Sequence, residues 1–123
     1  MKPGTSQSST MPGPVAPVEF GLPNKEELAR LLRTKYPGPN LGWGPRLRFK
    51  FGYCTPDDIY EAFIERLVNP STTWLDVGCG RNIFPSNAAL ARTLADRCKL
   101  LVGVDPDATI EENRFVHRRV RVA

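Results

Sequence analysis

The chain has 123 residues, of which 41% are hydrophobic, and it carries a net charge of +4. This length is enough for one domain with a modest core and too short for two. No apolar run approaches the roughly 20 residues of a membrane helix, and the N-terminus lacks the apolar core of a secretory signal. The three cysteines form neither a C-x-x-C pair nor an even set, which argues against a zinc site or a disulfide scaffold and favours the cytoplasm.

The positive charge is concentrated in the first part of the chain. Residues 1–50 carry eight Lys and Arg against three Asp and Glu, whereas residues 51–123 carry nine against ten. A nucleic-acid-binding protein gathers its basic residues on one face. Only the stretch from Arg46 to Phe51 hints at such a face, because basic and apolar residues alternate there as on a strand. The sequence therefore does not support a nucleic-acid partner, and we favour a solvated basic face over a substrate-steering patch.

The N-terminal part combines a polar tail with a capped helix. The first residues are rich in Ser, Pro, Gly and Thr, so they bury too little apolar surface to offset the entropy lost on ordering. We predict a disordered tail over residues 1–20 and a single α/β domain over residues 21–123. Asn24 and Glu27 have the spacing of a capping box, and Pro37 ends the helix that follows.

A loop and a second helix come next. The segment 38–53 is heavy in Gly and aromatic residues, so we interpret it as loop-like. Thr55 is a suitable N-cap, and Pro56 fits the first helical position. The helix that follows carries a broad apolar face, which predicts that it is buried against a sheet.

The rest of the chain reads as strands and a helix in alternation. Thr73 to Val77 is an apolar run of the kind buried on both faces of a parallel sheet. A helical pattern covers residues 88–98, a second strand covers Leu100 to Val104, and a third starts at His117. This order predicts a Rossmann-like fold, in which helices flank a mostly parallel sheet that is incomplete.

Two glycines and a carboxylate follow the ends of the first two strands. Ligands of open α/β sheets bind beyond the carboxyl ends of the strands. Gly78 and Gly80 lie at such an end, where a missing Cβ permits a sharp turn and close approach of a ligand. Asp105 ends the next strand, where a carboxylate can accept hydrogen bonds from both hydroxyls of a ribose. These positions predict a site for an adenosine-bearing cofactor.

The motifs that carry this chemistry resemble a known family. Asp76-Val77-Gly78-Cys79-Gly80 and Val102-Gly103-Val104-Asp105-Pro106 are similar to motifs I and II of the class I S-adenosylmethionine-dependent methyltransferases. The resemblance covers about residues 50–123, the N-terminal half of such a catalytic domain. It implies methyl transfer from S-adenosylmethionine to an acceptor that the sequence does not identify, and it supplies no general base.

The resemblance also implies roles for individual residues. Asp76 would attract the cofactor's ammonium group, Asp105 would hold the ribose hydroxyls, and Pro106 would contact the adenine. The backbone beside the methionine moiety would come from Gly78, Cys79 and Gly80. Tyr53 would belong to a segment that covers the cofactor.

Several features of the sequence bear on alternative functions. The dinucleotide fingerprint requires a small residue at position 83, where this chain has Ile83, so an NAD(P)-binding oxidoreductase is disfavoured. Asn82 stands where the methyltransferases often have a third glycine. The incomplete sheet leaves the alternative of a non-catalytic interaction module that self-associates through an exposed edge. We favour Cys79 as a small loop residue over a nucleophile, because a thiolate needs a base and His117, the only histidine, lies on a different predicted element.

Overall fold

The computed structural model describes residues 21–37 and 43–123. The disordered tail expected over residues 1–20 lies outside the described residues. Four helices, three strands and a 3-10 helix follow one another along the described chain: α2 (Lys25–Lys35), α3 (Trp43–Phe51), α4 (Pro56–Leu67), β1 (Thr73–Val77), α5 (Ala88–Arg97), β2 (Leu100–Asp105), η1 (Ala108–Glu112) and β3 (Arg118–Arg121).

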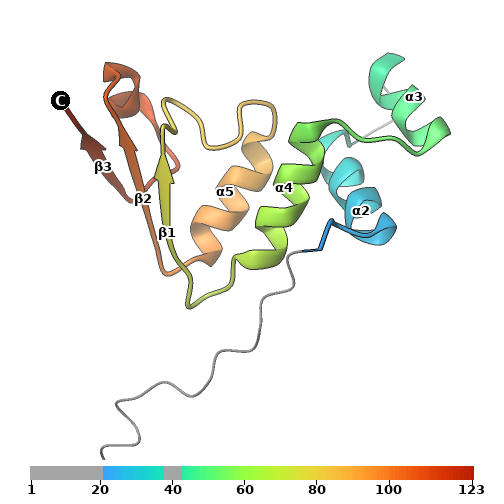
Figure 1. The fold of residues 1–123 in the computed structure, drawn as a ribbon, viewed down its shortest axis with the longest axis horizontal. Coiled ribbons are helices and arrows are strands. Elements are labelled where there is room, and N and C mark those ends of the chain that lie inside the picture. Colours follow the sequence, from blue (N-terminus) through green and yellow to red (C-terminus); the bar gives the residue numbers. More distant parts are fainter. Residues whose placement is uncertain (1–20, 38–42) are drawn as a thin grey trace, which may run out of the picture.

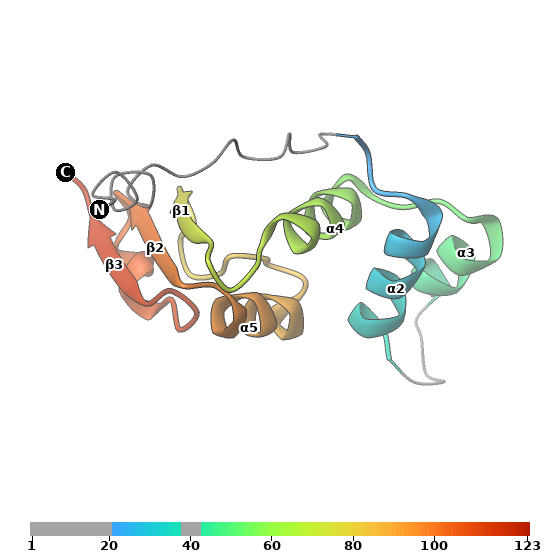
Figure 2. The same cartoon turned by 90° about the horizontal axis from the view of Figure 1, so that it is seen from below.

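The three strands form one parallel sheet in the order β1-β2-β3. In the register of this sheet, Trp74 lies beside Leu101 and Asp76 beside Gly103. Figures 1 and 2 show the sheet at one end of the described chain, with α5 and α4 next to it and with α2 and α3 at the far end. The predicted α/β class is confirmed, and the arrangement is that of a partial Rossmann-like layer.

The sheet is covered on one face only within the described residues, so the prediction that the first strand is buried on both faces is wrong. Trp74 packs against the core, as do the completely buried Leu101 of β2 and Leu94 of α5. On the opposite face, Leu75 is 61% exposed and Val77 is 73% exposed. The apolar run predicted a strand correctly, but it could not show whether a second layer of helices covers it.

The predicted helix starts are confirmed at atomic detail. The Asn24 side chain accepts a hydrogen bond from the backbone of Glu27 at 2.8 Å, and the Glu27 side chain accepts one from the backbone of Asn24 at 3.0 Å. Thr55 and Asp58 make the same reciprocal pair at the start of α4. Both caps satisfy donors that the first helical turn leaves without partners.

The prediction of a loop with a strand-like basic stripe before α4 is wrong, because most of this segment forms α3. In α3, Arg48 donates a hydrogen bond to the Tyr36 hydroxyl at 2.6 Å, and its guanidinium lies 4.9 Å from the centre of the Tyr36 ring. This contact joins α3 to the end of α2. A contact with a neighbouring element can override the local alternation of basic and apolar residues.

The apolar face of helix α4 predicts a helix buried against the sheet, but only part of this face packs toward the sheet. The helix lies between α5 and α2 (Figures 1 and 2). Ala62 is buried in the core, and Ile64 packs against the core from its edge. Tyr60 remains half-exposed, although its ring meets Phe84 edge-on with 6.0 Å between centroids. Part of the apolar surface of α4 therefore contacts helices and loops instead of strands.

A buried charged cluster joins the helical layer, and we call Lys35, Asp58, Glu61 and Asn87 the Lys35 cluster. The Lys35 ammonium lies 2.8 Å from Asp58 Oδ1 and 3.0 Å from Glu61 Oε2. Asn87 donates a hydrogen bond to Glu61 Oε1 at 2.8 Å. Burial disfavours the charged forms, but the hydrogen bonds outweigh it, so the pKa of Lys35 is raised and that of Asp58 is lowered. The Lys35 cluster therefore links α2, α4 and the start of α5, and we assign it a structural role.

Candidate functional site

The carboxyl ends of β1 and β2 lie side by side, and the glycine turn begins there. The backbone N–H of Gly78 donates to the Val104 carbonyl at 2.7 Å, which extends the contact between the two strands by one residue. Gly78 has φ +78° and Gly80 has φ +52°. Both values lie in the left-handed region, where a side chain is strained, so the sharp turn explains why glycine stands at these positions.

The Asp105 carboxylate holds this turn against the end of β2. Its Oδ2 accepts a hydrogen bond from the Gly80 backbone at 2.8 Å, and its Oδ1 accepts one from the Asp107 backbone at 2.8 Å. The residue is only 8% exposed. A carboxylate has about four lone-pair sites, so two remain after these backbone bonds. Asp105 is therefore first a clamp between two loops, and a ligand would share it with the backbone.

Asp76 differs from Asp105 in having no partner. Within the part of the chain that the structure describes, no hydrogen bond or ion pair involves its carboxylate. Burial alone raises the pKa of Asp76 above its ordinary value. Burial raises the pKa of Tyr60 on α4, and the negative charge of Asp76 adds to this rise. A partly buried carboxylate without a donor is unusual, since proteins normally pair such groups.

The Cys79 side chain is part of the hydrophobic core and packs beneath the glycine turn, between the turn and β2. It is buried, and its Sγ lies 3.7 Å from the side-chain amide nitrogen of Asn113. Burial, helped by the charges of Asp76 and Asp105, raises the pKa of the Cys79 thiol. A protonated, enclosed thiol is a poor nucleophile, so the structure agrees with a packing role for this side chain.

Two further residues shape the turn and were not identified from the sequence. Asn113 is completely buried and donates a hydrogen bond to the Gly80 carbonyl at 3.0 Å. A Cβ at Gly103 would lie 2.7 Å from Cys79 Sγ and 2.8 Å from a methyl carbon of Val116. Any other residue at Gly103 would force Cys79 or Val116 to shift, because their side chains pack directly on the β2 backbone. Neither role has a local sequence signal, since both depend on contacts between distant segments.

The remaining predicted positions lie around this centre. Pro106 is exposed directly after β2, and its carbonyl accepts a hydrogen bond from Arg121. Tyr53 is half-exposed in the connection between α3 and α4. Figure 1 shows this connection on the side of the molecule toward which the strands run. The structure thus groups Asp76, Asp105 and the glycine turn, and within the described residues it shows no hydrogen bond, ion pair or ring contact between Tyr53 and this group.

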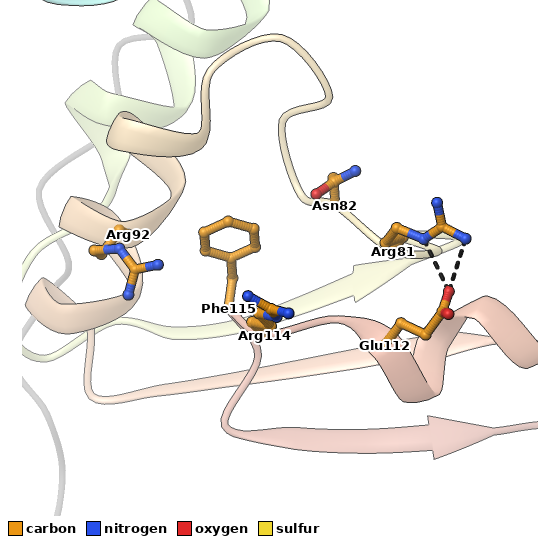
Figure 3. A pocket seen from close by; sticks show the side chains of 6 residues that line it. All are labelled: Arg81, Asn82, Arg92, Glu112, Arg114 and Phe115. Atoms are coloured by element: carbon orange, nitrogen blue, oxygen red, sulfur yellow. Dashed lines mark hydrogen bonds and ion pairs between the residues drawn. The ribbon is translucent and has the colours of Figure 1, made fainter.

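An open cavity of about 500 Å³ lies beside the turn. It is lined by Arg81, Asn82, Arg92, Glu112, Arg114 and Phe115, which Figure 3 shows as sticks. Arg81 and Glu112 form an ion pair at 2.7 Å in which both side chains are about 60% exposed. Arg81 is therefore directed to Glu112.

The described residues contain no group of three or more His, Cys, Asp or Glu side chains that could hold a metal ion. Among them, no helix is both long and apolar enough to cross a membrane. Comparisons with models of protein families, with curated proteins and with solved structures give no significant match. The geometry at the strand ends is therefore the basis for assigning a function.

Proposed function

We propose that the chain binds S-adenosylmethionine at the ends of β1 and β2 and supplies the cofactor-binding half of a cytoplasmic methyltransferase. Asp76 carries this proposal. Its carboxylate is partly buried and has no partner among the described residues, whereas the ammonium group of a bound amino acid would provide both a positive charge and hydrogen-bond donors. The resemblance to motifs I and II gives the same residue the same role.

The other groups have complementary roles. The glycine turn offers backbone close to Asp76, and apart from Gly78 and its chain neighbours no atom lies within 4 Å of the Cβ position of Gly78. Asp105 retains two lone-pair sites for ribose hydroxyls. S-adenosylmethionine supplies a methyl group on a positively charged sulfur, and catalysis by this family rests mainly on the relative positions of donor and acceptor. The acceptor is not assigned.

Calorimetric titration of the whole chain with S-adenosylmethionine tests the proposal. We expect saturable binding that weakens by at least tenfold in Asp76→Asn, because one charge-assisted contact is removed. Asp105→Ala should weaken it as well, and NAD should not bind. Saturable binding of NAD instead would favour an oxidoreductase. A folded, monodisperse sample that binds neither molecule would contradict the proposal.

The exposed sheet face favours a second candidate, a non-catalytic interaction module. Leu75 and Val77 of β1 and Val120 of β3 are exposed on the same face of the sheet, on the two strands that flank β2. Apolar side chains gathered on one exposed face are typical of a contact with another protein. Sedimentation at increasing protein concentration distinguishes the two candidates. Self-association that Leu75→Lys abolishes, in a chain that binds no S-adenosylmethionine, would support the interaction module.

A further inference from the structure

The cavity beside the glycine turn carries an excess of positive charge. Three arginines and one glutamate line it. Arg81 is already paired with Glu112. Arg114 has no hydrogen-bond or ion-pair partner among the described residues, and Arg92 meets only the Phe115 ring, with 5.7 Å between the guanidinium carbon and the ring centre. Two guanidinium groups therefore remain without a counterion.

The arrangement of these groups suits a small ligand. Arg92 comes from α5, whereas Arg114 and Phe115 come from the segment after η1, so two separate elements border the same space (Figure 3). The volume of about 500 Å³ lies within the range of small-molecule sites. Phe115 is half-buried and gives the cavity an apolar wall.

We propose that this cavity is a binding site for a small phosphate-bearing molecule, separate from the S-adenosylmethionine site. A guanidinium group donates two parallel hydrogen bonds that match the oxygens of a phosphate. Two unpaired arginines balance the double negative charge of a phosphate monoester better than the single charge of a carboxylate. Asn82 adds an amide that can donate a further hydrogen bond.

Titration of inorganic pyrophosphate into the isotope-labelled chain, followed by NMR, tests this site. We expect saturable shifts centred on the amides of Arg81, Arg114 and Phe115, and weaker binding at high salt. Arg114→Gln and Arg92→Gln should each weaken binding by about tenfold. Glu112→Gln should strengthen it by about threefold, since Arg81 is then released toward the ligand.

Matched controls separate a site from general attraction to a basic protein. Arg33→Gln removes the same charge from the exposed side of α2 and should leave the affinity unchanged. Equal weakening by Arg33→Gln, or shifts spread over all basic surfaces, would overturn the proposal. So would a lack of saturable shifts up to ~10 mM pyrophosphate. Binding of S-adenosylmethionine should be unaffected by Arg114→Gln, so the two proposals can fail independently.

Discussion

The Lys35 cluster and the strand-end site both place carboxylates away from water, but only in the cluster does each carboxylate have hydrogen-bond partners. In the cluster, Asp58 and Glu61 share one ammonium group, and each carboxylate has further hydrogen bonds. At the strand ends, Asp105 is held by two backbone donors, whereas Asp76 has none among the described residues. Every carboxylate oxygen of the cluster has a donor, which offsets the cost of removing these charges from water. At Asp76, a bound ligand can supply the hydrogen-bond donor or positive charge that the described residues do not provide.

Breaking the Lys35 cluster should have the largest effect. Lys35→Met leaves two buried carboxylates without their cation, and removal of one partner of a buried pair typically lowers the free energy of unfolding by about 3–5 kcal/mol. Urea denaturation measures the loss. Lys25→Met, on the exposed start of the same helix, should change the stability by less than about 0.5 kcal/mol. Similar values for the two variants would show that the cluster contributes no more than a surface charge.

The close packing under the glycine turn should give the next largest effect. Gly103→Ala places a methyl group within 3 Å of Cys79 Sγ and of Val116, and such overpacking typically costs about 1–3 kcal/mol. Gly44→Ala is the matched control, because nothing lies within 4 Å of its Cβ position. Thermal unfolding of both variants tests the difference. A stability of Gly103→Ala equal to that of the original chain would mean that the turn moves freely on β2.

Removing the charge of Asp76 should stabilise the fold slightly, opposite in sign to the first two changes. Burial raises the pKa of Asp76 in the folded state above its ordinary value of 3.8. As pH rises from 3.8 through the folded-state pKa, the folded state holds its proton longer than the unfolded state, so stability falls. Because asparagine does not ionise, Asp76→Asn lacks this loss of stability and should be modestly more stable than the original chain at neutral pH.

Denaturant titrations of both chains across the pH range check this sign. The advantage of Asp76→Asn should shrink as pH falls toward 3.8. Asp96→Asn, an exposed change on α5, should show no such trend. A neutral-pH stability of Asp76→Asn below that of the original chain would mean that the carboxylate is paired, as in the Lys35 cluster.

Removing the exposed ion pair between Arg81 and Glu112 should have the smallest effect on the free energy of unfolding. Both side chains are mostly in water, and such pairs contribute about 0–1 kcal/mol. Arg81→Gln should therefore leave the midpoint of urea unfolding nearly unchanged. A loss above about 2 kcal/mol would assign the pair a structural role comparable to that of a buried one.

Local patterns predicted much of this fold. The caps at Asn24 and Thr55 depend on residues three positions away, and both were predicted correctly. The alternation of strands and helices also predicted the α/β class with a parallel sheet. Helix α3 was missed, because its contact between Arg48 and Tyr36 is not visible in the spacing of its own residues.

Contacts between distant segments account for what the sequence did not reveal at the site. Lys35 meets carboxylates 23 and 26 residues away, and Asn113 reaches back 33 residues to Gly80. No periodicity encodes such pairs. The positions of Asp76 and Asp105 were predictable because strand ends in a parallel sheet always meet at one edge. Whether each carboxylate is paired was not predictable, since that depends on the backbone of the neighbouring loop.

The clamp formed by Asp105 has a consequence for the way a ligand associates. Three hydrogen bonds fix the glycine turn in the free chain: the Gly80 backbone donates to Asp105, Asn113 donates to the Gly80 carbonyl, and the Gly78 backbone donates to β2. The conformational entropy of the turn is therefore lost during folding and not during binding. A molecule that arrives at the strand ends meets a preorganised surface, and more of its contact energy is retained as affinity.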